Sequence, residues 1–491
     1  MTAQKRPTTS DSSPVLKGRL TTFKITVMVV AAAAPISCIA GIVPLSFAIG
    51  SGASTPAAFL IAGVVLLFFA VGYAAICRRM SSAGGFYKFI AVGLGKPPAV
   101  AAALVAIVAY NAVALTCVAG LGYFGSLVLH SLFGLTVPWP VLSVIAVAVV
   151  GFLGYREIDV AAKVLVVLLA AEVAMIVVLD VAIVVHKGLD AFPLSIFAPH
   201  RVASTGSIGL GLMFALLSFI GFESAALYGE ETDEPRKTVP RSTYLSVGVI
   251  SVFYFLSTWI AVGAIGPDQV QPYAAKELGN TFFDLSDSYA SSALTAVMQL
   301  TYLTSLLASL LSLHNVTNRY VFVAGRQGLL PRWLGVAHPS HGTPSHASLV
   351  QTAVNLLCIG IAMAAGMDPY LDVVTSMTGL GTLGVVLLQL AASAAIGVYF
   401  WRRRANLTGT LIATAVAFVG LGLLVVLIVR NFHALTGAES FFIDALPWAL
   451  VALVVLGSAY GFWLKRTRPA RYRGIAADPE QPAFAADCQE S

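Results

Sequence analysis

Long apolar runs dominate this sequence and constrain its fold more than any other feature. A helix needs about 20 apolar residues to cross the hydrocarbon core of a bilayer. Backbone groups in lipid must hydrogen-bond within their own segment, so each such run is predicted to be an α-helix. Twelve runs qualify, with approximate edges 25–50, 54–77, 97–130, 137–154, 160–186, 205–229, 242–265, 288–321, 346–366, 371–400, 407–430 and 444–464.

The composition agrees with a lipid environment and excludes several classes of protein. Hydrophobic residues make up 58% of the 491 residues and charged residues only 11%, against roughly 25% charged in a soluble domain. A soluble globule with so little charge would expose large apolar patches. A soluble enzyme, a fibrous protein and a nucleic-acid binder are therefore excluded, and the sequence predicts an all-α membrane protein. No cofactor or metal ion is predicted, because the cysteines lack metal-ligand spacing.

The distribution of Lys and Arg predicts the orientation of the chain. With the N-terminus in the cytoplasm, 25 of the 29 Lys and Arg residues fall in inner segments and four in outer loops. The positive-inside rule then places both termini in the cytoplasm of a multi-pass cell-membrane protein, in contact with membrane lipids. The polar segments 1–20 and 466–491 are predicted to be disordered cytoplasmic tails.

Two of the predicted spans are interrupted near their middle. The first contains Pro35, Gly41 and Pro44, and proline removes a backbone donor and clashes with the preceding turn. The sixth contains Gly221 and Glu223. If the first ten helices form two halves of five, spans 1 and 6 are the first helix of each half. Because five is an odd number, the two halves enter the membrane from opposite sides. Paired interruptions point to a substrate site in a secondary transporter; the alternative is a packing kink in each span.

Three segments in predicted inner loops follow a known pattern in the right order. They are GFESAALYGEETDEPRKTVPRS at 221–242, SSAGGFYKFIAVGLG at 81–95 and NRYVFVAGRQGLLPRWLGVAHPSHGTPSHA at 318–347. Together they resemble the amino acid–polyamine–organocation (APC) transporter superfamily. The resemblance implies twelve transmembrane helices, with a 5+5 inverted-repeat core of the leucine-transporter type at 21–400 and two C-terminal helices at 401–465. Span 1 departs from the pattern, because many relatives have a Gly-x-Gly-type break where this chain has Ala-Pro-Ile-Ser.

Candidate substrate-binding residues lie at the two interruptions. In span 1, a break at Pro35 and Gly41 would free the amides of Ser37, Cys38 and Ile39 at a half-helix N-terminus, which suits an anion. The resemblance implies that the α-carboxylate of the substrate binds there. The alternative for the Ser37 hydroxyl is a bond back to its own helix.

In span 6, a break at Gly221 would free the carbonyls near Ser218, Phe219 and Ile220, which could receive an ammonium group. Phe222 would cover that group as a cation–π wall or gate. The alternative for Phe222 is packing alone.

Span 3 contributes Asn111, which either contacts the substrate or bonds to a neighbouring helix. Tyr302 and Ser305 in span 8 are further, weaker candidates.

Three carboxylates lie inside predicted spans, where an ionised group is costly and is functional or paired by default. Glu172 lies near the middle of span 5, where some proton-coupled relatives carry a lysine in place of a coupling ion. Glu172 and Glu223 are therefore the candidates for ion coupling, and a neutral, hydrogen-bonded carboxyl is the structural alternative for each. Asp180, nearer the outer face, is assigned to structure or to the entrance.

These features favour a secondary active transporter that imports an amino acid or related amine together with a proton. An exchanger of amino acids or amines is the main alternative, and a sensor built on a transporter fold is a further one. Neither an enzyme nor an ATP-driven pump is predicted, because no catalytic cluster converges and no Walker motif is present.

Overall fold

The computed structural model describes residues 21–80, 85–156, 162–198, 206–223, 225, 232, 234–338, 343–403, 408–435 and 441–476. Every regular element in these ranges is a helix, as the sequence predicts. The three segments of the family resemblance are described only in part, because 81–84, 226–231 and 339–342 lie outside these ranges.

Nine helices of the described ranges are long and apolar enough to cross a membrane. They are α4 (Thr55–Cys77), α6 (Lys96–Phe133), α8 (Ala162–Lys187), α11 (Pro235–Ile265), α14 (Ser292–Arg326), α15 (Ser345–Ala364), α16 (Thr375–Arg402), α17 (Thr408–Asn431) and α18 (Phe441–Thr467).

Shorter helices complete the bundle. Apolar segments too short for that test are Pro35–Ala48, Trp139–Tyr155 and Ile208–Leu217, which coincide with predicted spans 1, 4 and 6. The remaining elements are α1 (Thr22–Ala32), α2 (Pro35–Ser37), η1 (Cys38–Ile42), α3 (Val43–Ala48), η2 (Gly52–Ser54), α5 (Gly85–Gly93), α7 (Trp139–Arg156), η3 (Gly188–Ala191), η4 (Leu194–Phe197), α10 (Ile208–Leu217), α12 (Val270–Glu277), η6 (Leu278–Asn280), α13 (Thr281–Tyr289), η7 (Arg332–Gly335), η8 (Pro369–Val374), η9 (Phe432–Leu435) and α19 (Pro469–Gly474).

The interruption predicted in span 1 is confirmed, and it begins before the proline. Ala34 has φ 46° and ψ 70°, a left-handed conformation that is unfavourable for a residue with a side chain. Pro35 then starts α2, where its missing N–H costs nothing. The carbonyl of Ala33, freed by the break, accepts hydrogen bonds from the Tyr254 hydroxyl (3.2 Å) and the Cys38 thiol (3.3 Å). Side chains thus satisfy the backbone that the broken helix leaves open.

The interruption predicted in span 6 is also confirmed. The α-helix α10 ends at Leu217, and the next amides bond three residues back, with Phe219 N–H donating to Leu216 O (3.1 Å) and Ile220 N–H to Leu217 O (2.9 Å). Gly221 follows with φ 118°, a backbone conformation that other residues rarely adopt. The glycine therefore permits the chain to leave the helical path here.

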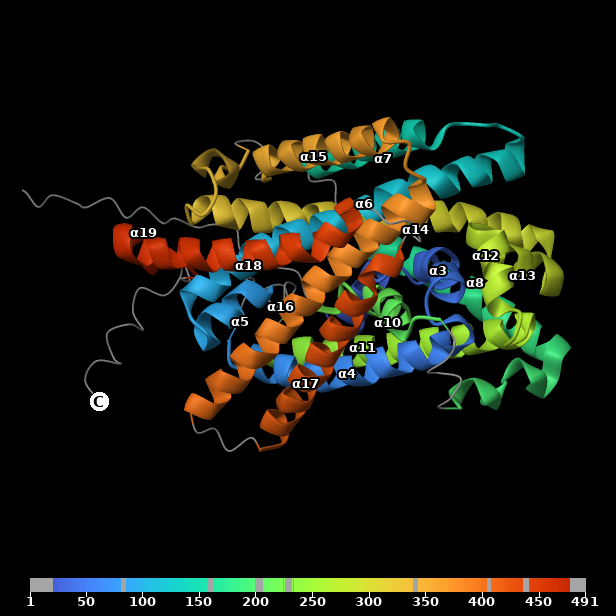
Figure 1. Cartoon of the computed structure of the whole chain (residues 1–491), viewed down its shortest axis with the longest axis horizontal. Coiled ribbons are helices and arrows are strands. Elements are labelled where there is room, and N and C mark those ends of the chain that lie inside the picture. Colours follow the sequence, from blue (N-terminus) through green and yellow to red (C-terminus); the bar gives the residue numbers. More distant parts are fainter. Residues whose placement is uncertain are drawn as a thin grey trace, which may run out of the picture.

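Helix α6 lies at the centre of the packing, with α5, α7, α14, α16 and α18 against it. Figure 1 shows α7 and α15 side by side along one flank, and these two helices are in contact. It also shows α5 and α19 at one end of the molecule and α12 and α13 at the opposite end. The two interrupted helices lie between these ends.

The start of the predicted C-terminal tail is ordered, so the prediction of a disordered segment from residue 466 is wrong for its first part. Helix α18 continues to Thr467, and α19 follows it. The Lys96 ammonium group donates to the carbonyls of Tyr472 (3.1 Å) and Arg473 (2.7 Å), in the last turn of α19, and Ile475 is fully buried. A cation at a helix C-terminus is a favourable partner, and the distant sequence position of Lys96 hides it from local analysis.

Candidate functional site

A small cavity lies where the two interrupted helices face α6 and α14. Its volume is about 70 Å³, and since one buried water needs roughly 10–15 Å³ on this measure, it has room for roughly five waters or a small organic molecule. No charged side chain lines the cavity. The lining residues are Ala33, Ala34, Ser37, Cys38, Gly41, Ile42, Val113, Thr116, Cys117, Gly120, Phe124, Leu217, Ile220, Tyr302, Leu306, Ser309, Leu313, Tyr370 and Val374.

Two hydroxyl groups of this lining have no hydrogen-bond partner among the described residues. They belong to Ser37 of α2 and Ser309 of α14, and both side chains are buried. The predicted alternative for Ser37, a bond back to its own helix, is therefore absent from this structure. A buried hydroxyl without a partner is costly, so both groups are available to a polar ligand in the cavity.

The structure brings only part of the predicted site to the cavity. Four predicted binding residues line it: Ser37, Cys38, Gly41 and Ile220. Of the weaker candidates, Tyr302 also lines it. The predicted residues that do not line it are Pro35, Ile39, Asn111, Ser218, Phe219, Gly221 and Phe222.

Two of these residues have other surroundings in this structure. Phe222 is fully buried and packs edge-on against Phe69 and Tyr73, with ring centroids 5.9 and 6.4 Å apart. The Ser218 hydroxyl donates to the carbonyl of Phe214 (3.2 Å), within its own helix.

The half-helix N-terminus lies slightly earlier than predicted. The Cys38 amide already donates to the carbonyl of Ala34 (3.0 Å), so it is not free, because α2 begins at Pro35. The amide at the start of the half-helix is that of Ile36, and it faces the carboxyl group of Glu172. A carboxylate at a helix N-terminus is favoured by the partial positive charge there.

Glu172 reaches this N-terminus from α8, across the first interruption. Its side chain is 6% exposed and lies beside the hydroxyl of Ser305. Its Oε2 atom is buried and has no hydrogen-bond partner among the described residues. The carboxyl group is therefore only partly satisfied.

Glu223, at the second interruption, has both carboxyl oxygens occupied. The Tyr110 hydroxyl donates to Oε1 (2.6 Å) and the Gly221 amide donates to Oε2 (3.1 Å). The Tyr73 hydroxyl donates to the Glu223 carbonyl (2.6 Å). Tyr110 also stacks on Tyr320, with ring centroids 5.6 Å apart. Glu223 thus ties the unwound segment after α10 to α4 and α6.

A layer of five aromatic rings separates this cavity from a larger hollow. We call it the aromatic layer, and its members are Tyr123, Phe124, Phe283, Tyr302 and Tyr370. Tyr123 stacks on Tyr370 (centroids 4.7 Å apart) and Phe124 packs on Tyr302 (4.4 Å). Phe124, Tyr302 and Tyr370 line the cavity, whereas Tyr123 and Phe283 line the larger hollow.

Two π-helical turns meet at the aromatic layer, one in each half of the chain. The Tyr370 hydroxyl of η8 donates to the carbonyl of Gly41 in η1 (2.6 Å). Gly41 has no room for a side chain, because a Cβ atom would overlap the Tyr302 hydroxyl. π-Helical turns release backbone groups from the regular pattern and are frequent at functional sites.

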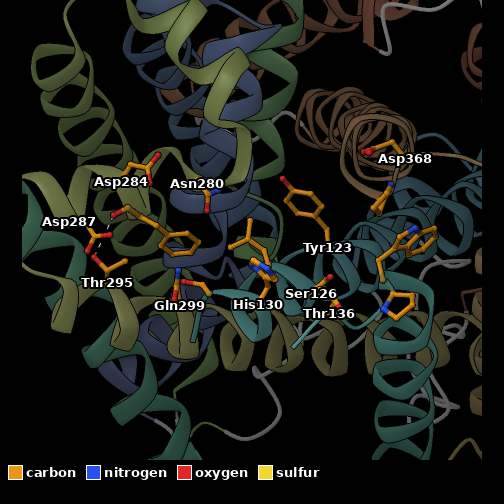
Figure 2. Close-up of a pocket in the computed structure, with 16 residues that line it drawn as sticks. Tyr123, Ser126, His130, Thr136, Asn280, Asp284, Asp287, Thr295, Gln299 and Asp368 are labelled. Carbon is orange, nitrogen blue, oxygen red and sulfur yellow. Dashed lines mark hydrogen bonds between the residues drawn. The ribbon is translucent and has the colours of Figure 1, made fainter. Parts of the chain in front are cut away.

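The larger hollow, here called the vestibule, has a volume of about 780 Å³. Figure 2 shows the residues that line it, with Asp284 and Asp287 of α13 on one side and Asp368 on the other. Asp368 also accepts hydrogen bonds from the amides of Tyr370 and Leu371, as the cap of η8.

Sequence reasoning missed several lining residues. Thr116 and Cys117 are small polar residues inside an apolar run, and that contrast was a usable signal. Tyr370 gave no such signal, because its role depends on a bond to Gly41, 329 positions away in the chain. The third carboxylate, Asp180, lies away from the cavity and accepts a hydrogen bond from Ser257 (2.6 Å).

The fold and the cavity define a class of protein: a multi-pass helical membrane protein with a small buried cavity between two interrupted helices. Comparison with known families identifies the protein family within this class. The amino acid permease family matches residues 20–457, so the chain belongs to this family, within the APC superfamily predicted from its motifs.

Three individual relatives each match part of this chain at less than 30% identity. An uncharacterized transporter of Mycobacterium tuberculosis is 29% identical over 187 residues, 38% of each chain. A branched-chain amino acid permease of Lactococcus lactis is 27% identical over 199 residues, 40% of this chain and 41% of the relative. A cationic amino acid transporter of Arabidopsis thaliana is 26% identical over 179 residues, 36% of this chain and 28% of the relative. The matched segments therefore span well under two thirds of these relatives.

Proposed function

We propose that this chain is a secondary active transporter that imports an amino acid by binding it in the cavity between the two interrupted helices. The observation that carries the proposal is the position of the cavity, at both interruptions of a chain that belongs to the amino acid permease family. Unpartnered hydroxyls in an otherwise largely apolar lining suit a small polar molecule with an apolar side chain.

The lining favours a neutral amino acid over a cationic one. A cationic side chain brought into this cavity would find no carboxylate on its wall, and an unpaired charge there is costly. Apolar side chains such as Ile42, Ile220 and Leu306 suit an aliphatic group instead. Among the relatives, this chemistry agrees with the branched-chain permease better than with the cationic transporter.

The proposed architecture is the one implied by the motifs. Ten helices within 21–400 form a 5+5 inverted-repeat core, and the helices at 401–465 add two, which gives twelve spans. The nine long helices and the three shorter apolar segments support this number.

Both termini lie in the cytoplasm of a cell-membrane protein in this proposal, with α5 and α19 on the cytoplasmic side. Single cysteines placed at Asp190 and at Lys237 should then be labelled from opposite sides of the membrane. Labelling of both from the same side would overturn the orientation.

Coupling to a proton is assigned to Glu172, with Glu223 as the second candidate. Glu172 is buried, faces the start of the half-helix and has an unpartnered oxygen. It can therefore hold a proton in its neutral state and accept a hydrogen bond from the Ile36 amide in its ionised state. Exchange of one amino acid for another without a proton remains the alternative mechanism.

The experiment is uptake by the purified chain in proteoliposomes, with a panel of neutral, cationic and anionic amino acids and amines. Accumulation of a neutral amino acid that depends on an imposed pH gradient is the expected result. Counterflow without any gradient, together with no gradient-driven accumulation, would favour the exchanger. The absence of uptake and of counterflow for every compound would overturn the proposal.

A further inference from the structure

The last described segment of the chain, residues 469–476, is joined to other helices by specific contacts, and we call it the C-terminal strap. Ile475, just after α19, is fully buried. The Ala476 amide donates to the hydroxyl of Tyr87 in α5 (2.8 Å). That hydroxyl donates in turn to the side-chain carbonyl of Gln327, at the end of α14. The strap therefore connects α5 to α14 through one tyrosine.

Further contacts fix the strap to α6 and α14. The Lys96 ammonium, at the start of α6, donates to the last turn of α19 and lies over the ring of Tyr472, 5.5 Å from its centroid. Hydrogen bonds from a charged donor are about twice as strong as neutral ones. The Cδ atom of Arg471 lies 3.6 Å from the position of a Cβ atom at Gly328, beyond the end of α14. Figure 1 shows α5 and α19 at the same end of the molecule.

Other side chains of α5 pack toward the second interruption. The rings of Phe86 and Phe89 contact Tyr73 edge-on, with centroids 6.1 and 5.5 Å apart. Tyr73 in turn packs edge-on against Phe222, with centroids 6.4 Å apart. All four side chains are buried, and we call them the inner ring cluster. Phe222 is two residues from Ile220, which lines the cavity.

Helix α5 also approaches α14 closely. Gly85, the first residue of α5, has φ 52°, and a Cβ atom there would lie 2.9 Å from the Tyr320 hydroxyl. Tyr320 stacks on Tyr110, whose hydroxyl donates to Glu223. Aromatic rings therefore lead from the second interruption to α5 by two routes, and a movement at either end is transmitted to the other.

A secondary transporter opens its site to the two faces of the membrane in turn, by moving one group of helices against another. The vestibule lies beside α13, at the end of the molecule opposite α5 and α19 (Figure 1). Opening at the α19 end requires the inner ring cluster, and α5 with it, to move. We propose that the C-terminal strap is a latch, which while docked holds α5 in place and keeps the site closed toward the α19 face. This inference rests on the proposed transport function.

The reactivity of the cavity cysteines tests the latch. Cys38 and Cys117 line the cavity, and the substitutions Cys77→Ala, Cys358→Ala and Cys488→Ser leave them as the only two of the five cysteines. A membrane-impermeant thiol reagent is applied to right-side-out and to inside-out vesicles that contain the full chain. A second chain that retains Cys488 shows, by its labelling, which vesicles expose the C-terminal face.

Two variants release the strap in different ways. Lys96→Met removes the cation at the last turn of α19 and should raise labelling of the cavity cysteines from the C-terminal face about tenfold, as expected for the loss of a hydrogen bond from a charged group. Ala476→Pro removes the amide that donates to Tyr87, and proline cannot adopt the φ of 57° found there, so a several-fold rise is expected. Neither variant should raise labelling from the opposite face, because the latch shifts one equilibrium between two states.

Arg466→Met is the matched control. It removes an exposed cation at the end of α18, before the strap begins, and should leave labelling from both faces unchanged.

Two outcomes would overturn the latch. Unchanged labelling in both variants would show that the strap does not keep the site closed. A rise from both faces, with a lower midpoint of thermal unfolding, would show that the strap stabilises the fold without controlling access. Uptake by the unaltered chain tests the proposed function, whereas the difference in labelling between that chain and its variants tests the latch, so the two failures are distinguishable.

Discussion

A buried glutamate lies at each of the two helix interruptions, and the two carboxyl groups differ in their hydrogen bonds. Glu223 lies within the interrupted segment after α10. The Tyr110 hydroxyl and the Gly221 amide donate hydrogen bonds to its two carboxyl oxygens. Glu172 comes from another helix, α8, and its Oε2 has no partner among the described residues. A fully bonded carboxyl resists change, whereas a partly bonded one can gain a proton or a new donor at low cost. The difference supports the proposal that Glu172, ahead of Glu223, is the carboxyl that handles a proton.

The largest expected effect comes from the first interruption itself. Gly41→Ala places a Cβ atom against the Tyr302 hydroxyl, inside a layer of packed rings that has little freedom to move. We expect uptake to fall by at least about tenfold, since overpacking costs roughly 1–3 kcal/mol. Gly360→Ala is the matched control, because nothing lies within 4 Å of its Cβ position. Normal uptake by Gly41→Ala would show that transport does not require the close approach of η1 to α14.

Glu172→Gln tests the proton-handling role. Glutamine keeps the shape and one acceptor but fixes the neutral state, so we expect exchange of substrate to continue while accumulation against a gradient is lost. Asp180→Asn is the control on the same helix, and it should keep accumulation, because Asp180 already has a partner in Ser257. If Glu172→Gln accumulates substrate with the wild-type pH dependence, Glu172 is structural, and Glu223 becomes the carboxyl to test.

Glu223→Gln should change stability more than coupling. Its amide can accept from Tyr110 or from Gly221, but it offers one oxygen where the carboxyl offered two. A loss of about 1–3 kcal/mol in the free energy of unfolding is expected, measured as a lower midpoint of thermal unfolding. Pronounced loss of gradient-driven accumulation with unchanged stability would reverse the roles of the two glutamates.

Tyr370→Phe should give the smallest effect of the series. It removes the hydroxyl that bonds the carbonyl of Gly41 but keeps the ring in the aromatic layer. A cost of about 1 kcal/mol would loosen the link between η1 and η8 and change the KM for uptake by roughly fivefold or less. Tyr123→Phe keeps the aromatic layer and leaves the bond between Tyr370 and Gly41 intact, so it serves as the control. Equal changes in KM for both variants would show that this bond has no specific role in transport.

Much of the fold could be predicted because its causes are local. Lipid forces each apolar run to satisfy its own backbone, so run length alone predicts helices. Pro35 and Gly221 then mark where two of these helices break, since their backbone restrictions do not depend on distant contacts. The family, too, could be predicted from short loop motifs.

The site was less predictable, because it depends on contacts between distant parts of the chain. The sequence marked Glu172, Ser37 and Gly41 as unusual, but it did not show that Glu172 faces Ile36 or that Phe222 packs away from the cavity. The structured start of the C-terminal segment depends in the same way on Lys96, far from it in sequence.

By itself, then, the sequence determined the helices, their interruptions and the family, because membrane burial and backbone restrictions act residue by residue. Only the tertiary structure decided which carboxyl oxygen lacks a partner, which rings separate the cavity from the vestibule, and which aspartates line the vestibule. Those features arise from helix packing, which joins residues hundreds of positions apart and leaves no periodic trace in the sequence.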